Sequence, residues 1–132
     1  MTKMIFVNLP VTDLKRSIQF YEALGFKQNK EFSDDSGAGM VWDENIWVML
    51  LTRDFYQKFL KDQTTADTHE TSGSMTAFSL PSVEDVKKFA QTAEANGGES
   101  YHIDIGMPED QMYELDVKDP DGNVLSAVWM AM

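Results

Sequence analysis

Residues 4–11 form a short run that is apolar except at Asn8, and it predicts a β-strand with Val7, Leu9 and Val11 on one face. Met4, Phe6, Asn8 and Pro10 are expected on the other face. Apolar residues then recur at helical spacing from Leu14 to Leu24, and Gly25 ends the pattern, so a helix is predicted here. The rest of this half predicts three strands, over residues 26–32, 40–42 and 46–52, and a short helix over residues 53–61.

The second half of the chain repeats this order. A strand is predicted over residues 75–80, and a helix follows whose buried stripe runs from Val83 to Ala93. Three more strands are predicted over residues 98–105, 111–117 and 124–130, with a tight turn at residues 119–123 before the last one. A repeat of this length predicts two copies of one supersecondary module that share a site.

The length of 132 residues predicts a single domain built from these two modules. The first module is predicted to span residues 1–61 and the second residues 75–132. Residues 62–74 are rich in Thr, Ser, Asp and Gly and lack large apolar side chains, so they are predicted to be the linker.

Charge and composition exclude several classes of function. The net charge of −11 and the isoelectric point near 4.4 argue against nucleic-acid binding, which needs clustered Lys and Arg. No apolar run is long enough to span a membrane, and the start of the chain leaves no room for a signal peptide, so a cytoplasmic protein is expected. The absence of cysteine excludes disulfides and cysteine-bound metals.

Two motifs resemble those of a known family. The first is Val11-x-Asp13-Leu14-x-x-Ser17-x-x-Phe20-Tyr21-x-x-Leu24-Gly25-Phe26, and the second is Asp119-Pro120-Asp121-Gly122-Asn123 followed by an apolar strand. In this order they resemble the opening and closing signatures of the vicinal oxygen chelate superfamily, which includes glyoxalase I, bleomycin-resistance proteins and extradiol dioxygenases. The resemblance implies an α+β fold in which two βαβββ modules form a glyoxalase-like curved mixed sheet around a cavity.

Members of that superfamily that use a metal hold it on inward-facing strand positions. The resemblance places these positions at Phe6, Leu50, Met75 and Ser126. None of these side chains is an imidazole or a carboxylate, and a slip of one or two residues along any strand does not introduce one. We therefore expect no metal site of the family type and no cofactor. With Leu50 facing inward, alternation sends Trp47 and Met49 toward the helices.

The candidate site residues follow from the same alignment, and they suit binding better than catalysis. Phe6, Trp42, Leu50 and Met75 are expected to supply contact area to a ligand. The polar side chains expected to orient it are Asn8, Tyr113 and Ser126. No catalytic residue is predicted, because the sequence contains no Ser–His–Asp arrangement or nucleophile elbow.

The leading hypothesis is a metal-free protein that binds and sequesters a small molecule, as bleomycin-resistance proteins do. The ligand is expected to be aromatic or cationic, and the protein is expected to form a homodimer. One alternative is a glyoxalase- or dioxygenase-like enzyme with unusual metal ligands among His102, Glu114, Glu44 and Glu99. Another is a homodimeric interaction module. His102 and Asp104 lie two residues apart on a predicted strand, and they are interpreted as an exposed polar face, as an acid–base couple or as half of a relocated metal site.

Overall fold

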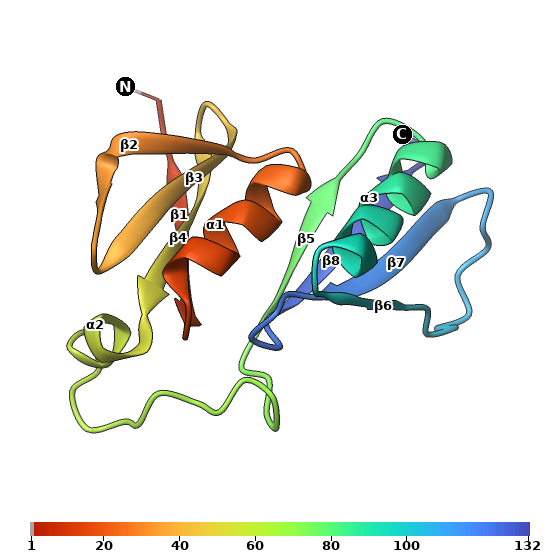
Figure 1. Cartoon of the computed structure of the whole chain (residues 1–132). Coiled ribbons are helices and arrows are strands. Elements are labelled where there is room, and N and C mark those ends of the chain that lie inside the picture. The colour runs from red at the N-terminus through yellow and green to blue at the C-terminus, as the bar shows by residue number, and fades with distance from the viewer. Residues whose placement is uncertain (1) are drawn as a thin grey trace. The chain divides into compact units, whose positions relative to one another are not determined.

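The protein is described by a computed structural model that covers residues 2–132. Its first half contains six elements: β1 (Ile5–Val11), α1 (Leu14–Ala23), β2 (Lys27–Asp34), β3 (Gly37–Asp43), β4 (Ile46–Thr52) and α2 (Arg53–Gln57). The second half contains five: β5 (Met75–Ser79), α3 (Val83–Ala95), β6 (Glu99–Tyr101), β7 (Met112–Lys118) and β8 (Val124–Met130). Figure 1 traces both halves along the chain.

The two halves have the same sheet topology, and this confirms the predicted repeat. The first sheet has the strand order β1-β4-β3-β2 and the second has the order β5-β8-β7-β6. In each sheet the opening strand pairs in parallel with the closing strand, and the remaining pairs are antiparallel. The α+β class with two βαβββ modules is therefore as predicted from the sequence.

Both long helices begin where the sequence provides a capping side chain. Asp13 accepts a hydrogen bond from the backbone nitrogen of Arg16 at 3.1 Å, at the start of α1. Ser82 accepts one from the backbone nitrogen of Asp85 at 3.1 Å, at the start of α3. These bonds satisfy backbone N–H groups that have no partner inside the helix. The helix therefore starts at the same point in each module.

Each module has its own apolar core between its long helix and one face of its sheet. In the first module, Phe20 and Tyr21 of α1 are buried, and α1 packs against β3 and β4. In the second module, Val86, Phe89 and Ala93 of α3 are buried, and this helix packs against β6, β7 and β8. The other face of each sheet, turned away from the long helix, is called its open face below.

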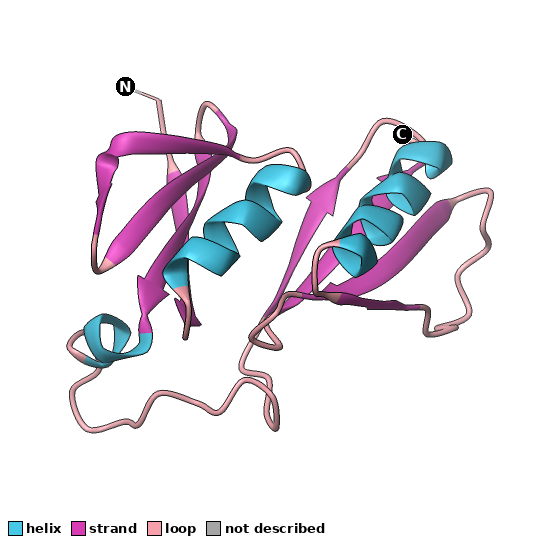
Figure 2. Cartoon of the chain, in the orientation of Figure 1, coloured by secondary structure: helices cyan, strands magenta, loops and turns pink. Residues whose placement is uncertain are grey.

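The segment between α2 and β5 forms neither helix nor strand within the described residues, as the loop colour in Figure 2 shows. Its first part is held by α2: Gln57 accepts hydrogen bonds from the backbone nitrogen and the hydroxyl of Thr65, both at 2.7 Å. The chain divides into two compact units between Asp67 and Thr68, inside the predicted linker. In the part of the chain that the structure covers, no helix has the length and apolar character needed to cross a membrane.

One predicted strand is much shorter than expected. The sequence predicts a strand over residues 98–105, but β6 ends at Tyr101 because its three residues pair only with Asp116, Val117 and Lys118 of β7. His102 and Asp104 consequently lie in the loop before β7, and their expected alternation on a strand is wrong.

Candidate functional site

The open face of the first sheet carries a cluster of aromatic rings around Trp47. Phe6 lies opposite Trp47 in the β1–β4 register, and their ring centroids are 5.5 Å apart. The ring of Phe32 contacts the same indole at 5.4 Å. Gly39 leaves space for the indole of Trp47, because a Cβ at position 39 would lie only 3.1 Å from that ring. Phe6 is 47% exposed and Phe32 60% exposed, so the cluster presents aromatic surface to solvent.

The expectation that Leu50 shares this face is wrong. Side chains alternate along a strand, so Leu50 points away from the side of β4 that carries Trp47 and Met49. Leu50 is fully buried and lies opposite Ala38, which is also fully buried, on the side of the sheet that α1 covers. Trp47 and Met49, which were expected to face the helices, belong to the open face instead.

Trp42 is also placed on the helix side. Its ring lies 4.9 Å from that of Phe26, and Phe26 in turn contacts Tyr21 of α1 at 5.3 Å. Trp42 therefore supports the core of the first module and is not part of the open face. Its expected role as a ligand contact does not fit this position.

Asn8 lines a small cavity at the end of the first sheet. The cavity has a volume of about 230 Å³ and is walled by Leu51 of β4 and by Tyr56, Phe59 and Leu60 in and after α2. Apart from the Asn8 amide and the Tyr56 hydroxyl, its lining side chains are apolar. The Asn8 amide is thus one of the few polar groups that line this cavity, and its role in orienting a ligand stays a prediction.

The open face of the second sheet contains Met75 and Ser126. Met75 and Ala77 alternate with Phe78, which is buried on the side of α3, and Ala77 lies opposite Ser126 in the β5–β8 register. Met75 is 68% exposed whereas Ser126 is buried. The two residues thus share a face, on which Met75 is exposed to solvent and Ser126 is covered by its neighbours.

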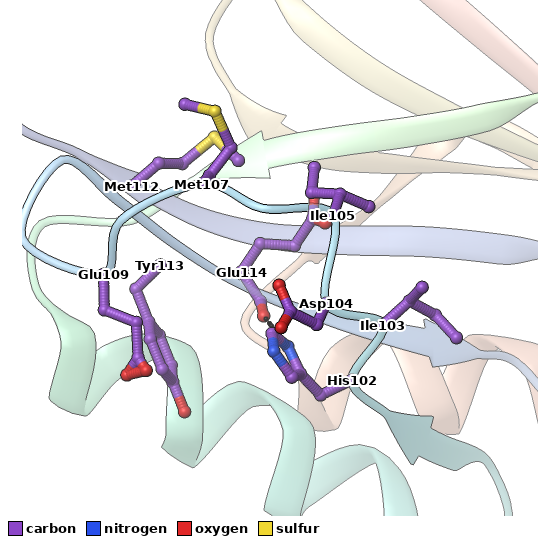
Figure 3. Close-up of a pocket in the computed structure, with 9 residues that line it drawn as sticks. All are labelled: His102, Ile103, Asp104, Ile105, Met107, Glu109, Met112, Tyr113 and Glu114. Carbon is purple, nitrogen blue, oxygen red and sulfur yellow. Dashed lines mark hydrogen bonds between the residues drawn. The ribbon is translucent and has the colours of Figure 1, made fainter.

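Tyr113 is on the opposite face. The ammonium group of Lys87, which belongs to α3, lies 5.8 Å from the centre of the Tyr113 ring. In Figure 3 the ring of Tyr113 lies beside Glu109 and extends toward α3, away from Met107 and Met112. Its expected role as a polar group that orients a ligand together with Ser126 does not fit this position, and it lines the pocket formed by the β6–β7 loop instead.

Asp116 is the polar residue of the open face that sequence reasoning missed. It lies opposite Ser126 in the β7–β8 register, and the hydroxyl of Ser126 donates a hydrogen bond of 2.8 Å to its carboxylate. Asp116 is only 8% exposed. Its place in an alternating strand two residues after Glu114 was visible in the sequence, but nothing in the sequence indicated that it is buried.

The β6–β7 loop forms a pocket of about 170 Å³ at the end of the second sheet, drawn in Figure 3. His102 approaches the backbone oxygen of Glu114 through Nδ1 at 3.2 Å. Burial, followed by the negative charge of Asp116, raises the pKa of the Glu114 carboxyl, while His102 acts in the opposite direction. Burial also raises the pKa of Tyr101, with smaller contributions from Asp116 and Glu99. The end of this sheet therefore concentrates negative charge in partly buried positions.

Comparison with known families shows to which superfamily the chain belongs. A family model, described as the Glyoxalase/Bleomycin resistance protein/Dioxygenase superfamily, matches residues 3–126. The chain belongs to this superfamily. A comparison with curated proteins gave no match.

Solved structures of the glyoxalase type share the fold. A hypothetical protein from S. aureus is 26% identical, with a TM-score of 0.78, and the match covers 98% of this chain and 95% of that one. A family enzyme from Burkholderia phytofirmans PsJN is 17% identical with a TM-score of 0.77, over 98% and 100% of the two chains. The fosfomycin resistance protein FosX from Listeria monocytogenes, in complex with Mn(II) and sulfate, is 13% identical with a TM-score of 0.71, over 100% and 93%.

The side chains of this superfamily member do not fit the metal that the family type implies. The open faces present Phe6, Met75 and Ser126 at three of the expected positions, and Met49 and Leu51 flank the fourth. A Mn²⁺ or Zn²⁺ ion needs oxygen or nitrogen donors from several such side chains. Within residues 2–132, no group of three or more His, Cys, Asp or Glu side chains is arranged to hold a metal ion.

Proposed function

We propose that this superfamily member binds a small organic molecule without a metal ion and sequesters it unchanged. The observation that carries the proposal is the set of side chains at the family's ligand positions, which is Phe6, Met75, Ser126 and the apolar residues of β4. These positions thus carry an aromatic ring, a thioether, aliphatic groups and one hydroxyl. Such groups favour contact with an organic ligand over coordination of a metal ion.

The chemistry of the open faces supports an aromatic or cationic ligand. The exposed rings of Phe6 and Phe32, which pack against the buried Trp47, offer surface for stacking on a flat ligand. Asn8 supplies an amide beside an apolar cavity, and Ser126 supplies a hydroxyl on the second sheet. The net charge of −11 attracts positively charged molecules to the surface.

Two measurements test this function together. Elemental analysis of protein purified without chelator should find no stoichiometric zinc, nickel, manganese or iron. A thermal-shift screen should find aromatic or cationic compounds that raise the melting temperature, because a ligand that binds only the folded state stabilises it. A stoichiometric metal, or turnover of a glyoxalase or dioxygenase substrate after metal addition, would instead establish the metal-dependent enzyme.

We further propose that the protein acts as a homodimer. Phe6, Phe32 and Met75 leave a large share of their apolar surface exposed within one chain. Exposed apolar surface of this kind is typical of association sites. Sedimentation at micromolar concentration should give twice the chain mass. A dimer that binds no compound in the screen would point to the interaction module instead.

A further inference from the structure

The second sheet buries a carboxylate on its open face. Asp116 occupies the centre of β7, with Tyr101 of β6 opposite it on one side and Ser126 of β8 on the other. Only 8% of the residue is exposed, and Ser126 beside it is 2% exposed. Because the fully buried Val117 and Leu125 occupy the other face, under α3, the Asp116 carboxylate is directed away from the apolar core.

The carboxylate of Asp116 has less hydrogen bonding than its burial requires. One oxygen, Oδ1, accepts the hydroxyl of Ser126 at 2.8 Å, and in residues 2–132 no other side chain or backbone N–H donates to the group. An ionised carboxyl has two oxygens and about four lone-pair sites that accept hydrogen bonds. Oδ2 is therefore left to solvent or to a ligand at the surface of the open face.

No cation of the described chain neutralises this group. Lys118 lies on the same face two residues along β7, but its ammonium group is directed to the edge of the sheet. There it lies 3.9 Å from the carboxylate of Glu99 and 5.7 Å from the centre of the Tyr101 ring. A buried charge is favourable only where an opposite charge or further hydrogen bonds compensate it.

The neighbouring carboxylate increases this excess of negative charge. Glu114 lies on the same face one alternation from Asp116, and the negative charge of Asp116 contributes to the raised pKa of its carboxyl. Apolar side chains lie near the two acids: Val128 of β8 lies opposite Glu114, and Ala77 of β5 lies opposite Ser126. The face thus combines negative charge at its centre with apolar surface beside it.

We propose that Asp116 binds the protonated amine of a small organic cation, whose apolar part lies against Ala77 and Val128. This inference rests on the proposed function and specifies its ligand class. A primary or secondary ammonium fits because it carries both the positive charge and the N–H donors that Oδ2 lacks. The hydroxyl of Ser126 positions the Asp116 carboxylate by its hydrogen bond. Ser126, which occupies one of the family's metal-ligand positions, thus acts here through Asp116.

A matched series of probes tests the charge requirement. The 2-phenylethylammonium ion is compared with 2-phenylethanol, which is neutral, and with 3-phenylpropionate, which is anionic, by calorimetry at pH 7. A fourth probe, phenylethyl-trimethylammonium, carries the charge without N–H donors. The primary ammonium should bind tightest, the quaternary ion more weakly, and the alcohol and the acid weakest.

Two variants locate the site. Asp116→Asn removes the charge and keeps the shape and an acceptor for Ser126. Glu99→Gln removes one negative charge from an exposed position on the same face. Asp116→Asn should weaken binding of 2-phenylethylammonium at least about tenfold, the loss expected for one charged hydrogen bond. Glu99→Gln should weaken it less than about threefold, because exposed charges interact weakly.

The outcomes separate this inference from the proposed function. Equal binding of the alcohol and the ammonium, or an equal effect of the two variants, would overturn the cation site while leaving a small-molecule binder. If none of the four probes and no library compound binds, both the site and the function fail. Should Asp116→Asn not fold, amide NMR of the wild type decides. The signals of Asp116 and Ser126 should then shift with 2-phenylethylammonium and not with 2-phenylethanol.

Discussion

The turn before β8 allows a sharp test of how the second module is held together. Gly122 has a φ of +86°, a conformation that L side chains rarely adopt. A Cβ at this position would lie 2.3 Å from the backbone oxygen of Thr68 and 3.2 Å from the Cα of His69. The substitution Gly122→Ala therefore adds strain and also displaces the segment that runs into β5.

The size of the effect follows from these two terms. An alanine in the left-handed region costs about 1–2 kcal/mol. Displacing residue 68 also breaks the hydrogen bond of 2.5 Å from the hydroxyl of Thr68 to the backbone oxygen of Asp121. Such a bond contributes about 1 kcal/mol. We therefore expect Gly122→Ala to lower the free energy of unfolding by about 2–3 kcal/mol, the sum of the strain and the lost bond.

Gly106 is the matched control. It has the same φ of +86°, but a Cβ there meets nothing within 4 Å. Gly106→Ala should thus cost only the strain, about 1–2 kcal/mol. Urea unfolding followed by circular dichroism measures both variants. If Gly122→Ala destabilises the protein no more than Gly106→Ala does, the segment at Thr68 is not seated against the turn in solution and the reasoning is refuted.

Three further predictions test the core, a helix cap and a titrating group. Leu50→Ala should destabilise the protein by about 2–5 kcal/mol without changing ligand binding, and Met49→Ala by clearly less; equal losses in urea unfolding would contradict the assignment of their faces. Asp13→Ala removes the cap of α1 and should cost about 1 kcal/mol, measured as a shift of the urea midpoint, which a retained midpoint would disprove. Glu114→Gln should stabilise the protein at pH 7. The raised pKa of Glu114 means that ionisation opposes folding, so this gain should disappear below about pH 4, where the carboxyl is protonated in the unfolded chain as well. A gain that persists at pH 3 would exclude this cause.

Local chemistry determined the fold to a large degree. Asp13 and Ser82 cap their helices, and such a cap depends only on backbone groups two or three residues away. The turn at residues 119–123 forms for the same reason: Asp119 accepts hydrogen bonds from the backbone nitrogens of Asp121 and Asn123, both at 2.9 Å. Local signals of this kind occur in both halves of the chain, and they were sufficient to predict two βαβββ modules.

Only the tertiary structure decided which side chains share a face. The run from Trp47 to Leu51 is apolar at every position, so it contains no alternation from which the orientation of Leu50 could be inferred. The burial of Asp116 likewise depends on Ser126, ten residues away on the neighbouring strand. The sequence by itself thus determined the elements and their order, because those depend on neighbouring residues. The composition of the open faces depends on strand pairing, which brings distant residues together and which no local pattern specifies.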